Sequence, residues 1–88
     1  MKLILSIIRN DDYDSVTSAL TTAGFRVTCI ASTGGFWRKG NSTLLIGLDD
    51  EKVEQAVQII KDACTTPVEP ATRRATIFVL NVADYAHF

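Results

Sequence analysis

Histidine and cysteine are scarce in this chain of 88 residues, and their scarcity limits the chemistry that it can perform. There is one histidine, His87, and there are two cysteines, Cys29 and Cys64. A zinc site takes Cys and His ligands at characteristic spacings that these residues do not match, so we expect no metal site within one chain. Both cysteines fall on apolar faces of expected elements. We interpret them as buried free thiols in a reducing cytosol.

Residue groups typical of an enzyme are also missing. The sequence contains no visible Ser/His/Asp or Cys/His grouping, and its only histidine stands next to the C-terminus. Adjacent acids occur as Asp11-Asp12 and Asp49-Asp50, each at the start of an expected helix, where capping accounts for them. We therefore expect no catalytic residues and no cofactor.

Neither sign of charge dominates, and no hydrophobic run is long. The formal net charge is −1, so the chain has no general basic field that would draw it onto DNA or RNA, and any anion site must be local. The apolar run at 3–8 is far shorter than the roughly 20 residues of a membrane-spanning helix. No small-residue cleavage site follows it. We expect a buried first strand rather than a signal peptide or a membrane segment.

What the sequence does contain is a succession of short strands and amphipathic helices. The expected strands are 3–8, 25–32, 42–49 and 75–82, and the expected helices lie within 10–24 and 49–64. Asp and Asn residues can cap both helices, and Gly24 can end the first one. The order βαββαβ predicts an α+β, ferredoxin-like sandwich: an antiparallel sheet with two helices on one face. A chain of this length forms a single domain, 1–88.

Two helices on one face leave the other face of the sheet without cover. The strands 3–8 and 75–82 are apolar on both faces, which favours a partner on the second face, and a symmetric homotrimer is one solution. We expect Phe78 in the core. Tyr85 and Phe88, in the tail, are candidates for contact with a neighbouring subunit.

The segment TGGFWRKGN, residues 33–41, joins the second and third strands and combines glycines, an aromatic pair and two cations. As an ordinary turn, it uses Gly and Asn for positive φ, and its aromatic residues pack on their own sheet. As a nucleotide site, it offers backbone amides around Gly35 to an anion, and Phe36 or Trp37 to a purine ring. The spacing matches neither a Walker loop nor GxGxxG. From these residues alone, both interpretations stand.

Residues on the adjoining strands can complete the second interpretation. Arg26 can hydrogen-bond a phosphate in a fork geometry that lysine cannot reproduce. Thr28 and Asn41 supply a hydroxyl and an amide for donor and acceptor edges. Gly47, inside an expected strand, would allow a ligand to approach the backbone closely.

The combination of RVT, TGGF and GNST, followed by a glycine in the third strand, resembles the PII-like cyclic di-AMP receptor family of bacterial signal-transduction proteins. The similarity runs over the whole chain. It implies a homotrimer that binds cyclic di-AMP in clefts between subunits and passes the signal to a downstream protein by rearranging loops. It also implies ligand contacts at the positions that carry the family's residue type, which are Arg26, Thr28, Gly35, Phe36, Asn41 and Gly47.

Two features depart from the family pattern. Trp37 stands where the family usually has a smaller aliphatic residue, so it can strengthen stacking or fill the pocket and shift ligand preference. Only ten residues, 65–74, occupy an interval where the family usually has a long loop, which bears on the output partner and on closure over the ligand. The loop after the second strand lacks the modified tyrosine of nitrogen-regulatory PII proteins, so control by uridylylation is not expected.

The function expected from these observations is that of a cytoplasmic, non-catalytic receptor for cyclic di-AMP. One alternative is a PII-like trimer that binds another adenine nucleotide, ATP or ADP. Another is a ligand-free trimeric interaction module in which Phe36 and Trp37 contact a protein. A copper-tolerance-type trimer of the same fold is disfavoured by the shortage of exposed His, Cys and Met ligands.

Overall fold

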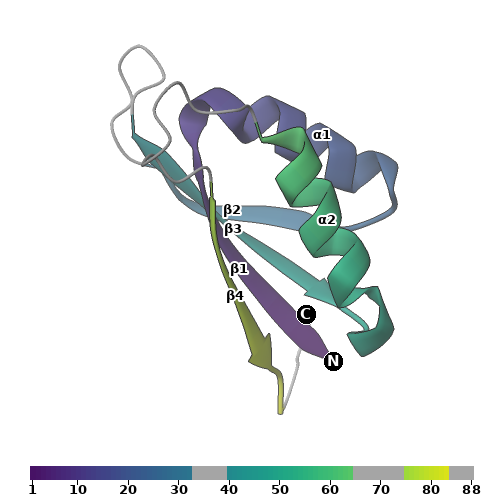
Figure 1. Ribbon diagram of the computed structural model, residues 1–88. Coiled ribbons are helices and arrows are strands. Elements are labelled where there is room, and N and C mark those ends of the chain that lie inside the picture. Colours follow the sequence, from purple (N-terminus) through teal and green to yellow (C-terminus); the bar gives the residue numbers. More distant parts are fainter. Residues whose placement is uncertain (33–39, 65–74, 84–88) are drawn as a thin grey trace.

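The structure, a computed structural model, describes residues 1–32, 40–64 and 75–83 and consists of one four-stranded sheet with two helices packed on it (Figure 1). The strands are β1 (Lys2–Arg9), β2 (Val27–Ser32), β3 (Asn41–Leu48) and β4 (Ala75–Asn81). The helices are α1 (Tyr13–Thr22) and α2 (Val53–Ala63), preceded by the 3₁₀ turns Asn10–Asp12 and Asp50–Lys52. The predicted order of strands and helices is confirmed, although β2 begins two residues later than expected.

The sheet has the strand order β2-β3-β1-β4, and every neighbouring pair is antiparallel. The first and third strands therefore occupy the centre, and β2 and β4 form the edges. This order and the two helices on one face confirm the predicted ferredoxin-like arrangement.

The core lies between the sheet and the helices. Alternate residues of β1 and β3 point toward α1 and α2, because successive side chains of a strand lie on opposite faces. The residues of this layer that are fully or almost fully buried are Ile4, Ile8, Val16, Leu20, Leu44, Ile46, Ala56 and Ile60. Neither described helix is long and apolar enough to span a membrane.

The opposite face of the sheet, here called the open face, carries no helix (Figure 1). Leu5 lies on it between Leu45 of β3 and Phe78 of β4. The prediction of Phe78 as a core residue is wrong, since 51% of it is exposed. Leu80, two residues further along the same face, is 45% exposed. An apolar surface therefore covers much of this face.

The helix ends differ in detail from the prediction. Gly24 follows the last turn of α1 with φ of +93°, which confirms its role in ending the helix. At the start of α1, the side chain of Asp12 makes no capping hydrogen bond, and Asp49 makes none before α2. The prediction that Asp or Asn side chains cap the two helices is therefore wrong. The chain instead enters each helix through a 3₁₀ turn, in which backbone hydrogen bonds hold the first residues.

A β-bulge interrupts the pairing of β2 with β3. The register shifts between Cys29 and Ala31, so Ile30 has no direct partner and Ala31 lies opposite Thr43. Ala31 therefore shares a face with Thr28 rather than with Cys29, whereas an uninterrupted strand would place Ala31 and Cys29 on the same face. Cys29 is also exposed, because the edge strand β2 lies beyond the cover of the helices, whereas Cys64 is buried as predicted. Neither cysteine takes part in a disulfide.

A short chain of polar side chains joins β2 and β3 to the end of β1. The hydroxyl of Ser42, which is buried, donates to Oδ1 of Asn10 at 2.5 Å and lies 3.0 Å from the hydroxyl of Ser32. The backbone N–H of Asn10 also donates to the carbonyl of Gly40 at 3.0 Å. These bonds hold the first residues of β3 against the start of the 3₁₀ turn.

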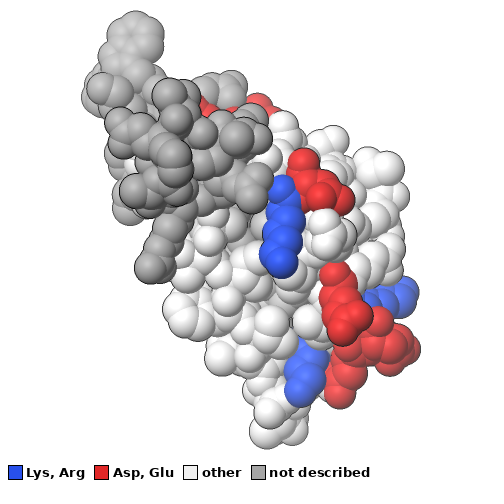
Figure 2. Space-filling view, in the orientation of Figure 1, with Lys and Arg blue, Asp and Glu red and all other residues white. Residues whose placement is uncertain are grey.

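Charged side chains of both signs are mixed on the face that carries the helices. In Figure 2 the acidic and basic residues of the described part of this face lie beside one another, and neither sign forms a broad area. This distribution agrees with a net charge close to zero.

Candidate ligand-binding site

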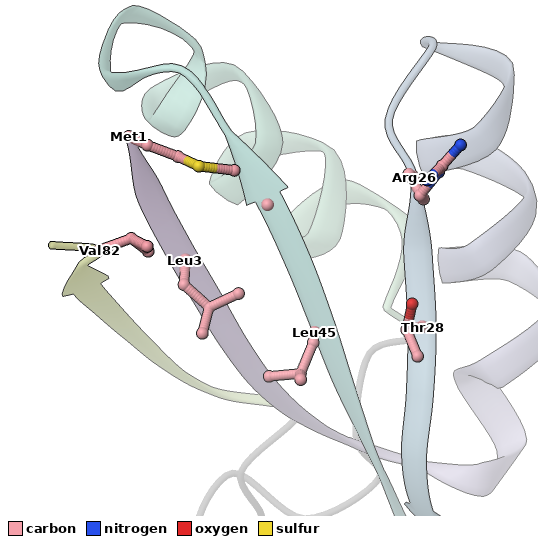
Figure 3. Close-up of a pocket in the computed structure, with 7 residues that line it drawn as sticks. Met1, Leu3, Arg26, Thr28, Leu45 and Val82 are labelled. Atoms are coloured by element: carbon pink, nitrogen blue, oxygen red, sulfur yellow. The ribbon is translucent and has the colours of Figure 1, made fainter. Parts of the chain in front are cut away.

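The open face is hollowed at the end of the sheet where β1 begins and β3 ends. The cavity has a volume of about 400 Å³ (Figure 3). It is lined by Met1, Leu3, Arg26, Thr28, Leu45, Gly47 and Val82.

Strand pairing brings the middle of this lining together. Leu3 of β1 lies opposite Gly47 of β3, and Thr28 of β2 lies opposite Leu45. Residues paired across neighbouring strands project from the same face of a sheet, so these four positions form a continuous floor across three strands. The missing side chain of Gly47 lowers that floor at one point.

Arg26 reaches the cavity because of the way the chain turns after α1. Gly24 reverses the direction in a left-handed conformation, and the buried Phe25 donates its backbone N–H to the carbonyl of Leu20 at 3.0 Å. The next residue, Arg26, is exposed and stands just before β2. Among the described residues it makes no ion pair.

The cavity has two chemically different sides. Arg26 and Thr28, both on the β2 side in Figure 3, provide a cation and a hydroxyl. The remaining side chains are apolar: Met1, Leu3, Leu45 and Val82. Such a cavity suits a molecule with an anionic group at one end and a flat or apolar group at the other, because Arg26 and Thr28 are the described lining residues whose side chains can donate hydrogen bonds.

Three of the seven positions expected to bind a ligand line this cavity: Arg26, Thr28 and Gly47. Asn41 does not. It lies at the other end of β3, opposite Arg9, and Gly47 is six residue steps further along the strand, which corresponds to roughly 20 Å. The other three positions, Gly35, Phe36 and Trp37, lie outside the described residues.

Four of the lining residues were not expected from the sequence. Leu3 and Leu45 could have been found, since they alternate with core residues and share a face with Gly47. Met1 and Val82 stand beyond the ends of β1 and β4, where the period of a strand no longer indicates a face. The bond from the Val82 N–H to the Met1 carbonyl, at 3.2 Å, brings them together.

The sequence and the fold are both similar to those of known proteins. A family model described as "Cyclic-di-AMP receptor" matches residues 1–69, a range that includes Arg26, Thr28 and Gly47. Among solved structures, the crystal structure of a functionally unknown protein from Pediococcus pentosaceus is similar with a TM-score of 0.78 at 30% sequence identity. The match covers 99% of this chain and 96% of that one, so the neighbour as solved has no large additional domain.

Proposed function

This chain belongs to the cyclic-di-AMP receptor family, and from that membership we propose that it binds cyclic di-AMP in the cavity beside Arg26 and relays the binding event to a downstream protein. The family is one of receptors, and a signalling role through ligand binding follows from it. We propose that the protein acts in the cytoplasm and without catalysis. Two cysteines that form no disulfide are what a reducing compartment favours.

The main support for this proposal is that Arg26, Thr28 and Gly47 line the same cavity. Arg26 stands just before β2, Thr28 lies at the start of β2, and Gly47 lies near the end of β3. The sequence alone indicates all three as ligand contacts. The guanidinium and the hydroxyl suit a phosphate of the ligand, and the apolar side suits a base. A cyclic dinucleotide carries both groups.

We further propose that the complete site lies between subunits of a homotrimer. The apolar open face supports an assembled state, since a monomer seldom exposes a large continuous apolar area. The position of Asn41 supports it too. A residue roughly 20 Å from Gly47 along β3 can contribute to the same ligand more readily from a neighbouring subunit than from the same one.

The relay of the signal is the part of the proposal that rests on the family alone. We propose that the ligand orders the loop 33–41, which carries Phe36 and Trp37, and that the rearranged loop changes the surface offered to the downstream protein. A ligand shifts such an equilibrium only as far as its affinities for the two states differ.

Tryptophan fluorescence provides a test, because Trp37 is the only tryptophan and belongs to the proposed site. Titration with cyclic di-AMP should give a saturable change, with ATP as the comparison ligand. A response to ATP instead would favour the ATP- or ADP-binding alternative. If neither nucleotide gives a change, and calorimetry detects no binding, the ligand-free interaction module becomes the better account.

Substitution of Arg26 sharpens this test. Arg26→Ala should weaken binding by about tenfold to a hundredfold, since a hydrogen bond to a charged group contributes about 1.5–3 kcal/mol. Lys61→Ala is the matched control, because it removes an exposed cation from α2, a helix on the other side of the sheet. Equal affinities of the two variants would contradict the assignment of Arg26.

A further inference from the structure

The space above Gly47 is not open, because the side chain of Met1 lies in it. A Cβ atom placed on Gly47 would meet the methyl carbon Cε of Met1 at 3.3 Å. In Figure 3 the thioether runs from the start of β1 toward the end of β3, across the cavity floor. A ligand that enters the cavity therefore meets the thioether where the sequence alone suggested bare backbone.

The backbone of Met1 is held in place. Its carbonyl accepts a hydrogen bond from the N–H of Val82 at 3.2 Å, and the next residue, Lys2, is paired with Leu48 and Asn81 in the sheet. The side chain, by contrast, is only partly covered, since 49% of Met1 is exposed. Methionine is unbranched, has three rotatable side-chain bonds and is polarizable, so it can adapt its shape to a neighbouring ring without leaving the cavity.

We propose that Met1 is a specificity-determining residue of this site: its thioether forms the wall against which an aromatic base of the bound nucleotide lies, while Arg26 and Thr28 hold a phosphate. This inference rests on the proposed function, because it assumes that the cavity takes a nucleotide. Among the described residues that line its apolar side, none has a hydrogen-bonding side chain, so this side suits a flat ring better than a sugar or a second phosphate. Contacts between sulfur and aromatic rings are favourable, and Met1 offers the only thioether in the chain.

The single methionine makes the proposal directly measurable. Protein carrying methionine labelled with ¹³C at its methyl group gives one such NMR signal, from Met1, provided that no added residue contains methionine. Cyclic di-AMP should move this signal through the ring current of the base, and the shift should saturate at the ligand concentration at which calorimetry shows saturation. Ribose 5-phosphate, which carries a phosphate but no base, is the control ligand and should leave the signal where it is.

The two possible failures are distinguishable. Calorimetric binding of cyclic di-AMP with an unmoved methyl signal would overturn the role of Met1 and leave the proposed function intact. A shift of the same size with ribose 5-phosphate would also overturn it, since the base would then not be the cause. Absence of both binding heat and shift would contradict the proposed function and, with it, this inference.

Discussion

Two buried serines of this protein differ sharply in what their hydroxyl groups do. Ser6 lies in the middle of β1 on the helix side, fully buried, and its Oγ has no hydrogen-bond partner in the part of the chain that the structure describes. Ser42 is almost as deeply buried, but its hydroxyl bonds to Asn10 and lies within hydrogen-bond distance of Ser32. A buried hydroxyl without a partner has lost its hydrogen bonds to water and has formed none within the protein. Removal of the Ser6 hydroxyl should therefore stabilise the protein, whereas removal of the Ser42 hydroxyl should destabilise it.

We predict that Ser6→Ala raises the free energy of unfolding by about 1 kcal/mol, because it removes a desolvated hydroxyl from an apolar layer. Ser42→Ala, the matched comparison, should lower it by about 1–3 kcal/mol, since it leaves buried partners without their bond. Urea unfolding at one fixed subunit concentration measures both changes. Destabilisation by Ser6→Ala would mean that its hydroxyl has a partner after all.

At the scale of single elements, the two helices are positioned mainly by how they end and by what they bury. Both begin in 3₁₀ turns without a side-chain cap, so the apolar stripe of each helix, represented by Leu20 and Ile60, supplies most of the stability. The end of α1 matters for the site as well. Gly24 and Phe25 set the direction in which the chain leaves the helix, and they thereby place Arg26 in the lining of the cavity.

Gly24→Ala should destabilise the protein by roughly 1–2 kcal/mol, through backbone strain alone. The φ of +93° disfavours a side chain, whereas no atom of a described residue beyond Gly24 and its two neighbours in the chain lies within 4 Å of the place that a Cβ would take. Gly24→Asn should cost less, because asparagine tolerates a left-handed conformation better than alanine does. Thermal unfolding of the two variants compares them. Equal losses would indicate that strain at this φ is not the cause.

At the scale of the whole molecule, the main feature is a sheet with one covered face and one apolar open face. Side chains of all four strands lie on the open face, and the proposed ligand cavity is hollowed into its edge. Assembly and ligand binding would therefore use adjoining parts of one surface. That arrangement is suited to a receptor in which contacts between subunits and contacts with the ligand influence each other.

Substitution on this face should disrupt the assembly. Light scattering should give wild-type particles three times the 9.6 kDa mass of one chain, and Phe78→Lys should shift them toward single chains. Val79→Lys is the control, because Val79 is similarly exposed but its side chain lies on the helix side of β4. A trimer that survives Phe78→Lys, or a wild-type monomer, would contradict the assembly proposed here.

The order of elements could be predicted from the sequence because the periods of strands and helices follow from backbone geometry. The alternation of side chains along a strand does not reveal which face of the strand is covered by helices. For that reason the sequence places Phe78 in the core, where the structure does not. The bulge beside Cys29 was equally hidden, since no residue type marks the shift in register.

The candidate site could be predicted in part, for a similar reason. Arg26, Thr28 and Gly47 stood out as residue types suited to a nucleotide, and they lie together. The apolar half of the cavity did not stand out, because leucine and valine in strands are ordinary. Met1 enters the cavity only through the pairing of strand ends, which no local pattern describes.

The most direct test of the central claim is a calorimetric titration of the wild-type chain with cyclic di-AMP, set beside the same titration with ATP. The account predicts saturable binding of cyclic di-AMP with one site per subunit, and binding of ATP that is weaker by at least an order of magnitude. Absence of saturable heat at high micromolar cyclic di-AMP would contradict this function, because the cavity beside Arg26 would then not bind the ligand after which the family is described.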